Sequence, residues 1–242
     1  QERARKLSLG EEKVPKLTSA AVIGAGVMGS GIAQWHSARG LRVIMKDVSP
    51  DRVAAGMANI ARLYETGRKR HTFSAIEARQ GMDRVSPAAT DVPLKRVDIV
   101  IEAAVEKMEI KKAIFRDLDD RVREDAILAT NTSALSITEL AAATRHPSRV
   151  IGIHFFNPVH QMQLVELVVG KETSPEVTRR ALRFVQSIGK LPVIVKDSPG
   201  FVVNRVLLPY MMEAGELFAQ GVNAREIDEA MLAFGMPMGP LR

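Results

Sequence analysis

Short apolar runs alternate with longer amphipathic stretches along most of this chain. The runs have the length of buried strands, and the stretches between them repeat apolar residues at the helical period. Strands that alternate with helices are joined by right-handed crossovers, so the pattern predicts an α/β fold with a doubly wound parallel sheet. We expect strands at residues 19–23, 41–45, 97–101, 126–129 and 150–153, and helices up to residue 38 and at 106–123 and 137–143.

The pattern changes near residue 200. Residues 174–188 still predict a helix and 191–195 a strand, but Ser198-Pro199-Gly200 breaks the chain and only helices follow, at 201–220 and 224–234. We expect three parts: a linker or tail at 1–18, a nucleotide-binding domain at 19–197, and at 198–242 the start of a second, all-helical domain that is truncated. Because the sequence lacks an initiator Met and stops just after a turn, we expect a piece of a longer polypeptide.

A glycine-rich turn joins the first predicted strand to the first helix. Gly24 allows the tight turn, Gly26 lets the backbone approach a pyrophosphate, and Gly29 lets helix and strand pack closely. Val27 and Met28 complete the turn, where the helix N-terminus attracts negative charge. Glycine trios alone are common, but this one stands between a strand and a helix. That context predicts a Rossmann-type dinucleotide site.

An acidic residue, Asp47, follows the second predicted strand. Its spacing from Gly24 is close to the roughly 20 residues that separate the first glycine from the ribose-binding acid of dinucleotide folds. A carboxylate there binds a ribose hydroxyl and repels a 2′-phosphate, so we expect NAD rather than NADP as the cofactor. The alternative is that Asp47 is a turn or N-cap residue before Ser49-Pro50.

Polar residues also follow three later strands. They are Glu102, then the run Asn131–Ser133, then His154. Ligands of doubly wound sheets lie beyond the carboxyl ends of the strands, so we expect Glu102 and Ser133 to contact the bound dinucleotide. Each of these residues could instead cap a helix, and Ser133 could start the helix near Ile137.

His154 is the candidate for acid–base chemistry. It ends an apolar run, and a turn with Asn157 and Pro158 separates it from a second apolar run, 164–168, which contains Glu166. A carboxylate in such a run is costly to bury unless it is paired, and His154 is the natural partner if the turn folds the runs together. A histidine held in this way has a fixed tautomer and can act as a general base. The alternative is a hydrogen-bonded core histidine.

Composition narrows the function further. The 242 residues contain no cysteine, so disulfides and thiolate metal sites are excluded, and we predict no metal site. No apolar run has the length of a membrane span. The net charge is +6, but basic and acidic residues are mixed and aromatic residues are few, so we expect no nucleic-acid partner. A polyanionic small ligand explains the charge equally well.

Five segments together resemble the 3-hydroxyacyl-CoA dehydrogenase portion of the multifunctional fatty-acid β-oxidation enzymes, specifically their bacterial-type alpha subunit. These are residues 24–31, 102–106, 131–133, 154–166 and 197–205, and the terminal Pro237-Met-Gly-Pro240 is similar as well. The resemblance implies an oxidoreductase of lipid degradation that uses NAD to oxidise (S)-3-hydroxyacyl-CoA to 3-ketoacyl-CoA. It implies a bacterial, cytoplasmic protein with an acyl-CoA substrate. In the full-length protein it implies a homodimer or a thiolase-containing complex.

The resemblance also implies roles for single residues. His154 would be the catalytic base and Glu166 its orienting partner. Ser133 and Asn204 would hydrogen-bond the 3-oxygen of the substrate or the histidine. Asn157 would lie between nicotinamide and substrate.

Further residues would bind the two nucleotides. By resemblance, Glu106 and Lys111 would contact the nicotinamide ribose. We place Arg68, Lys69 and Arg70 in a loop between two helical segments, on the side where the resemblance places the CoA nucleotide. One of them would hold the 3′-phosphate of CoA, because Lys and Arg commonly bind surface phosphates. The simpler interpretation of this basic run is a solvated helix end.

Two alternative functions remain open. One is a sibling dehydrogenase on the same fold, specific for 3-hydroxybutyryl-CoA or for a sugar acid. The other is a catalytically silent NAD-binding module. The presence of both His154 and Glu166 argues against the silent module, which needs no such pair.

Overall fold

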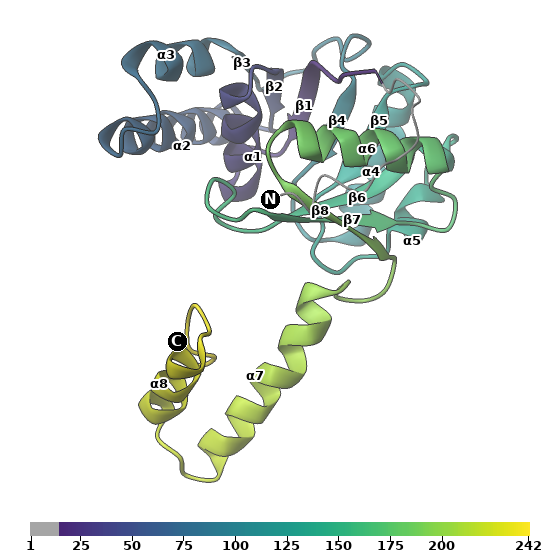
Figure 1. Ribbon diagram of the computed structural model, residues 1–242. Coiled ribbons are helices and arrows are strands. Elements are labelled where there is room, and N and C mark those ends of the chain that lie inside the picture. The colour runs from purple at the N-terminus through teal and green to yellow at the C-terminus, as the bar shows by residue number, and fades with distance from the viewer. Residues whose placement is uncertain (1–14) are drawn as a thin grey trace. The chain divides into compact units, whose positions relative to one another are not determined.

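The computed structural model describes residues 15–242, so most of the predicted tail at 1–18 lies outside the described residues. The chain divides into two compact units, one that ends at Ser198 and one that comprises Pro199–Arg242. The first unit is built on one eight-stranded sheet of order β3-β2-β1-β4-β5-β6-β7-β8 (Figure 1). Its strands are β1 (Ser19–Ile23), β2 (Arg42–Lys46), β3 (Val85–Ala88), β4 (Ile99–Glu102), β5 (Ile127–Thr130), β6 (Val150–Phe155), β7 (Leu164–Val169) and β8 (Leu191–Lys196).

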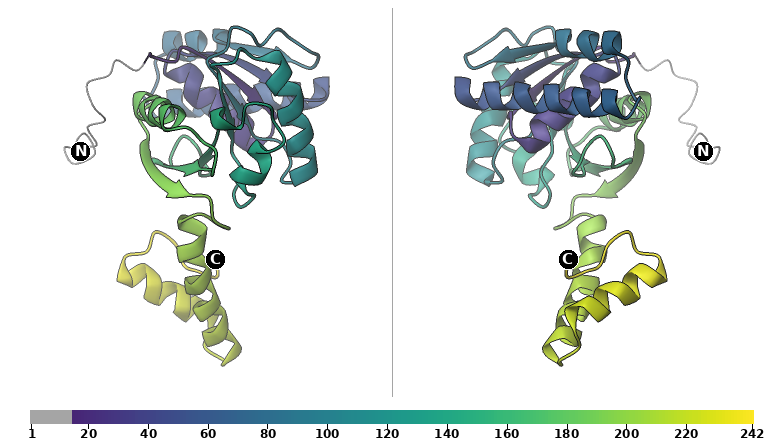
Figure 2. Two further views of the ribbon diagram at one scale, coloured as in Figure 1. Left: turned by 90° about the vertical axis from the view of Figure 1, so that its right-hand side faces the viewer. Right: turned by 90° about the vertical axis from the view of Figure 1, so that its left-hand side faces the viewer.

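Helices cover both faces of this sheet. In Figure 1, α6 lies in front of the sheet and α4 and α5 behind it, while α2 and α3 lie beside α1 at one end of the unit (Figure 2). The helices of the unit are α1 (Val27–Ala38), α2 (Pro50–Lys69), α3 (Ala75–Asp83), α4 (Met108–Arg121), α5 (Ile137–Ala141) and α6 (Pro175–Ser187), with a 3-10 turn, η2, at Pro147–Arg149.

Successive side chains of each strand point alternately into the two hydrophobic layers that cover the sheet. Ile99 and Ile101 of β4 belong to one large buried cluster with residues of α1, α2 and α6, whereas Val100 between them is buried outside this cluster. Near-continuous apolar strands are what a sheet covered on both faces requires. The prediction of a doubly wound α/β fold is therefore confirmed.

Two details differ from the expected pattern. Strand β3, which contains Pro87, pairs with β2 at the edge of the sheet, where proline costs least because one side of the strand has no neighbour. The sequence pattern gave no hint of it. Strand β7 runs antiparallel to β6, because a short turn rather than a helix joins them, and β8 then pairs parallel to β7.

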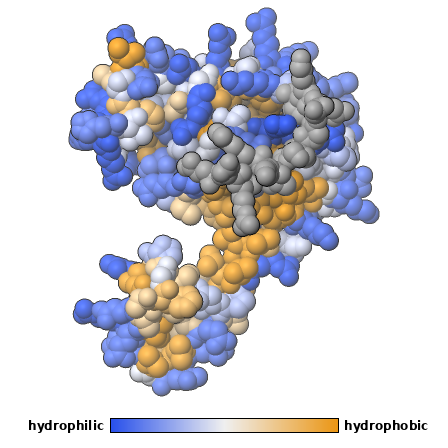
Figure 3. All heavy atoms as spheres, viewed as in Figure 1, coloured by the Kyte–Doolittle hydropathy of each residue, from blue (hydrophilic) through white to orange (hydrophobic). Residues whose placement is uncertain are grey.

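The second unit consists of two helices, α7 (Val203–Ala219) and α8 (Ala224–Phe234), which pack against each other. Ala214 and Ile227 are buried between them, but much of the apolar surface of this unit is exposed (Figure 3). The most exposed large apolar side chains of this unit are Val206, Leu208, Met211, Met212, Phe218, Phe234 and Met238. Within residues 15–242, no helix is long and apolar enough to span a bilayer.

Candidate active site

The glycine turn has the geometry that a dinucleotide site needs. Gly24 has a φ of 109°, and a Cβ there would lie 2.5 Å from the carbonyl oxygen of Ala103. A Cβ on Gly29 would lie 1.8 Å from the carbonyl oxygen of Gly24, so neither position accepts a side chain. Gly26 differs, because a Cβ there would meet nothing within 4 Å. The space above Gly26 and the uncapped N-terminus of α1 fit a pyrophosphate.

A cavity of about 700 Å³ opens beside this turn. Gly24, Gly26 and Asp47 line one side of it, and apolar residues of α4, among them Ile110 and Ile114, line the other. The order of the sheet reverses between β1 and β4, and this topological switch point is where doubly wound sheets bind nucleotides. The cavity fits the adenosine half of a dinucleotide.

Asp47 follows β2 directly and lies at the wall of this cavity. Its carboxylate accepts hydrogen bonds from the backbone N–H groups of Ala25 and Val48, each at 2.7 Å. The guanidinium of Arg52 lies 4.0 Å away. Asp47 is thus fixed against the glycine turn, whereas the N-cap of α2 is Ser49. The alternative interpretation of Asp47 as the helix cap is wrong.

Glu102 is buried at the end of β4. It is 0% exposed, and Lys111 Nζ donates to both of its oxygens at 2.8 and 2.9 Å. The hydroxyl of Thr130 and the N–H of Ala104 also donate to it, each at 2.7 Å. This burial contradicts the expectation that Glu102 contacts the cofactor directly. Glu102 instead positions Lys111, whose side chain is only 1% exposed. The contact of Lys111 with the nicotinamide ribose stays a prediction.

Glu106 is also part of this network. Lys111 Nζ lies 3.3 Å from one of its oxygens, and the backbone N–H of Ser133 donates to the other at 2.8 Å. Burial would raise the pKa of Glu106, but the bonds from Thr132 and Ser133 and the charge of Lys111 lower it below its usual range. Glu106 remains partly exposed, with 44% of its side chain accessible. It can therefore accept a hydrogen bond from a ligand such as a ribose hydroxyl.

The predicted pairing of His154 and Glu166 is present in the structure. The two residues are direct register partners of the antiparallel strands β6 and β7. Nδ1 of His154 lies 2.9 Å from Oε2 of Glu166, and the two residues are 5% and 1% exposed. The aromatic ring of Phe156 lies 4.5 Å from the imidazole, centre to centre. A carboxylate in this position accepts the Nδ1 proton, which directs Nε2 to chemistry.

The other predicted residues of this unit gather at the same end of the sheet. The side-chain oxygen of Asn131 accepts the N–H of Phe155 at 2.8 Å, which ties the end of β5 to the strand of His154. Ser133 and Asn157 are both exposed, beyond the ends of β5 and β6, and the peptide bond between Asn157 and Pro158 is cis. Ser133 does not begin a helix, since the N-cap of α5 is Ser136.

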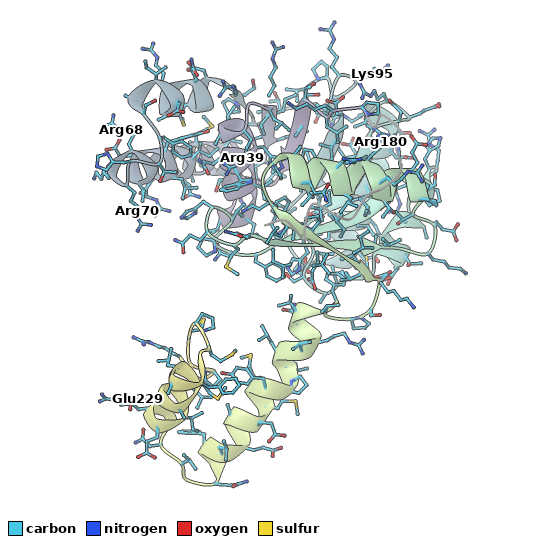
Figure 4. The ribbon with its side chains drawn as sticks, in the orientation of Figure 1. Arg39, Arg68, Arg70, Lys95, Arg180 and Glu229 are labelled. Atoms are coloured by element: carbon cyan, nitrogen blue, oxygen red, sulfur yellow. The ribbon has the colours of Figure 1, made fainter. Side chains whose placement is uncertain are left out.

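Two further predictions have different outcomes. Arg68 and Lys69 form the last turn of α2 and Arg70 is its C-cap, so the placement of this run in a loop is wrong. Figure 4 shows Arg68 and Arg70 at the outer end of that helix, where all three are exposed. Asn204 belongs to α7 in the second unit, and its role stays a prediction.

Asp197 was not predicted as a site residue. Its carboxylate accepts the hydroxyl of Ser136 at 2.8 Å and the N–H groups of Ile137 and Thr138 at 3.1 and 2.8 Å. It thereby fixes the last residues of the first unit to the start of α5, close in sequence to Ser133. The only signal in the sequence was its place in the segment 197–205.

Comparison with known proteins identifies the family. The model of the 3-hydroxyacyl-CoA dehydrogenase, NAD binding domain, matches residues 19–198, and that of the 3-hydroxyacyl-CoA dehydrogenase, C-terminal domain, matches residues 200–242. The fatty acid oxidation complex subunit alpha of Acinetobacter baylyi is 41% identical over 230 residues. That match covers 95% of this chain and 32% of the relative, so this chain spans about a third of the length of that protein.

Solved structures agree with this comparison. FadB2 of M. tuberculosis has a TM-score of 0.91 at 35% identity, over 93% of this chain and 81% of that chain. The (S)-3-hydroxybutyryl-CoA dehydrogenase PaaH1 from Ralstonia eutropha has a TM-score of 0.89 at 40% identity, over 93% of this chain and 80% of that chain.

Proposed function

Because this chain belongs to the 3-hydroxyacyl-CoA dehydrogenase family, we propose that it oxidises (S)-3-hydroxyacyl-CoA to 3-ketoacyl-CoA with NAD+ in fatty-acid β-oxidation. The observation that carries the proposal is the buried pair of His154 and Glu166 at the same end of the sheet as the glycine turn. A site that only bound NAD would have no use for a buried histidine–carboxylate pair beside it.

The residues divide the chemistry as follows. NAD+, when bound, accepts the hydride that leaves C3 of the substrate. The hydroxyl on C3 gives its proton to Nε2 of His154, and its oxygen becomes the carbonyl of the product. Glu166 holds Nδ1 and stabilises the imidazolium that forms. A positioned base of this kind contributes about 10²–10⁴-fold to the rate.

Other residues position the reactants. Glu106 binds the nicotinamide ribose, and Lys111, held by Glu102, keeps the Glu106 carboxylate charged and oriented. Ser133 and Asn157 are exposed beyond the ends of β5 and β6, where the substrate and the nicotinamide have to meet. Asn204 lies in α7 of the second unit, and the role that the family resemblance implies for it stays a prediction.

A turnover assay tests this function. NADH formation is followed with 3-hydroxybutyryl-CoA and with a long-chain 3-hydroxyacyl-CoA, on this chain and on the full-length protein that contains it. Turnover of either substrate supports the proposal, and the ratio gives the chain-length preference. Turnover of a sugar acid without CoA would indicate the sibling dehydrogenase. NAD binding without turnover by the full-length protein would indicate a silent module.

Asp47 sets the choice of cofactor in this proposal. Its carboxylate lies at the cavity wall and would oppose a 2′-phosphate. NAD should therefore bind much more tightly than NADP, and Asp47→Asn should narrow the difference. Titration of both cofactors, followed by intrinsic fluorescence, measures it. Comparable affinities in the wild type would show that Asp47 only supports the glycine turn.

The basic end of α2 is proposed to hold the 3′-phosphate of CoA. Arg68, Lys69 and Arg70 are exposed there. Burial lowers the pKa of His160, which lies beyond β6, and the nearby charge of Arg70 lowers it further. Replacing all three by Ala should raise KM for the CoA substrate and weaken its salt dependence, with little change in kcat. Lys95→Ala, another exposed cation (Figure 4), is the control.

Comparison of CoA with dephospho-CoA substrates sharpens this test. If the triple variant still prefers the phosphorylated substrate by the wild-type factor, the run is only a solvated helix end.

The partners are also proposals. The name of the A. baylyi relative refers to a fatty acid oxidation complex. We propose that the full-length protein acts in such a complex with a thiolase, or as a homodimer, in the bacterial cytoplasm. Size measurement of the full-length protein with and without a thiolase subunit tests these assemblies.

A further inference from the structure

Lys190 is a buried cation outside the predicted site. It lies between α6 and β8 and is 4% exposed. Its Nζ donates hydrogen bonds to the carbonyl oxygens of Val159 and Met162, the latter at 2.6 Å. Both carbonyls belong to residues 156–163, the turn between β6 and β7, and we call this segment the catalytic turn.

The surroundings of Lys190 are unusual for an ammonium group. Among the described residues, its hydrogen bonds and ion pairs include none to a carboxylate; its Nζ instead lies 3.6 Å from the centre of the Trp35 ring. Burial, and secondly the charge of Arg39, lower the pKa of Lys190 to about 8. Burying a charge costs free energy unless its bonds replace the lost water. Here two carbonyls and an aromatic face do so.

The catalytic turn also contacts α1, the helix that begins at the glycine turn and that we call the cofactor helix. A Cβ on Gly31 would lie 3.2 Å from a methyl group of Val159, so this valine packs where α1 lacks a side chain. Trp35 follows Gly31 by one helical turn and contacts Lys190. The turn is thus held between α1, which begins at the glycine turn, and Lys190.

We propose that Lys190 is a positioning residue that fixes the catalytic turn against the cofactor helix, so that Asn157 and the register of His154 with Glu166 stay in place during turnover. This inference rests on the proposed function for its kinetic part only. An ammonium suits the task because its three donors can bridge carbonyls that a neutral side chain of this length cannot. The hydrogen bonds of Lys190 go to backbone carbonyls of the turn, so it acts through the turn.

Arg39 provides a matched control. Its guanidinium lies over the same Trp35 ring, 3.1 Å from the centre, but its Nε donates to the carbonyl oxygen of Ile188 at 2.9 Å and not to the catalytic turn. Figure 4 labels Arg39. Lys190→Met and Arg39→Met therefore each remove one cation from the same ring, and only the first releases the turn.

The first measurement is hydrogen exchange of the amides of residues 156–163 in this chain. We expect Lys190→Met to speed exchange there by about tenfold or more, and Arg39→Met to leave it near the wild-type rate. Exchange in β1 and β4 serves as the internal reference for general loosening. Equal acceleration in both variants, or in all strands, would overturn the proposal.

The second measurement is kinetic and uses the full-length protein. Lys190→Met should lower kcat about 10- to 100-fold, because small misplacements of reacting groups have effects of this size, while the Kd of NAD changes by less than about threefold. Combined with Asn157→Ala, the loss in kcat should be smaller than the product of the single losses, since both act through the same turn. Independent losses would contradict the proposal.

Two checks complete the design. Lys190→Arg keeps a cation with several donors and should recover part of the lost kcat. If Lys190→Met does not fold, hydrogen exchange in Lys190→Gln is compared with that in Arg39→Gln, and faster exchange of residues 156–163 is again expected only in the first of these variants. If the wild type shows no turnover with hydroxyacyl-CoA, the proposed function fails. The exchange experiment then still tests the role of Lys190.

Discussion

Two buried carboxylates, Glu102 and Glu166, are similarly buried but have different hydrogen-bond partners. Each is at most 1% exposed; Glu102 is the last residue of β4, whereas Glu166 lies within β7. Glu102 is bonded by Lys111, by a hydroxyl and by a backbone N–H, which join successive βα elements of the parallel half. Glu166 faces His154 across the antiparallel pair of β6 and β7.

The difference in partner matches the difference in task. A lysine beside a glutamate forms a lasting ion pair, which suits a network that orients Glu106. An imidazole can take up and release a proton in each turnover, which suits a catalytic base. The antiparallel register also sets the two groups directly opposite each other on neighbouring strands. Under the proposed function, the site thus separates a fixed charge on the cofactor side from an exchangeable proton on the substrate side.

The largest effect should come from removing the exchangeable proton. His154→Gln should lower kcat in the full-length protein by up to about 10⁴-fold, because the substrate hydroxyl loses its base. NAD affinity should stay within a few-fold of the wild type, since the glycine turn and Asp47 are untouched. Single-turnover NADH formation and NAD titration measure the two quantities. A variant that retains most of its rate would remove His154 from the chemistry.

Removing the fixed charge should act on stability first. Glu102→Gln leaves the ammonium of Lys111 buried with a weakened set of acceptors, and breaking one side of a buried pair costs about 3 kcal/mol of unfolding free energy. Urea unfolding of this chain measures it. The double variant Glu102→Gln with Lys111→Met is the control and should recover part of the loss. No recovery would mean that Glu102 is held mainly by Thr130 and Ala104.

The corresponding change in the other pair, Glu166→Gln, should affect kcat more than the free energy of unfolding. Glu166→Gln should lower kcat by about 100-fold, because the imidazole loses both its orientation and the support for its charged form. Unfolding free energy should fall less than in Glu102→Gln, because an imidazole, unlike the ammonium of Lys111, can lose its proton and leave no buried charge behind. An unchanged kcat would exclude Glu166 from the mechanism, and a larger loss of stability than in Glu102→Gln would reverse the comparison.

The same contrast explains what could be predicted from the sequence. The parallel half could be predicted from local sequence patterns, such as the glycine turn and Asp47 after β2. The pairing of His154 with Glu166 could be predicted because a charged residue in an apolar run needs a partner. Glu102 was placed correctly at a strand end but given the wrong contact, because its burial depends on Lys111 folding back over it.

Other features had no local signal. The carbonyls that Lys190 binds are 28 and 31 residues away in sequence, and nothing in the composition around Lys190 indicates this contact. The short edge strand β3 contains a proline, which argues against a strand in any local pattern. The basic run at residues 68–70 was misplaced because α2 continues through Gly67 to Lys69 and is capped by Arg70.

The smallest predicted effect concerns a third buried carboxylate, Asp119, which lies outside the site and serves as a baseline. Arg149 donates to it at 2.5 Å, and the backbone N–H of Arg145 donates at 2.8 Å. Burial alone would raise the pKa of Asp119, but these bonds and that from His146 outweigh it and lower the pKa to about 2. A lowered pKa means that the folded state favours the charged carboxylate.

Asp119 should therefore stabilise the fold at pH values above its ordinary pKa of 3.8, and this contribution should be lost as the pH falls through about 2. We expect the loss to be about 1–2 kcal/mol of unfolding free energy. Asp98 and Asp197 also have lowered pKa values, so acid unfolding of the wild type alone cannot isolate Asp119. The difference in urea stability between the wild type and Asp119→Asn, measured from pH 5 to pH 2, removes their contribution. That difference should shrink towards pH 2; if it stays constant, the Asp119 carboxylate contributes packing and geometry but no charge that the fold depends on.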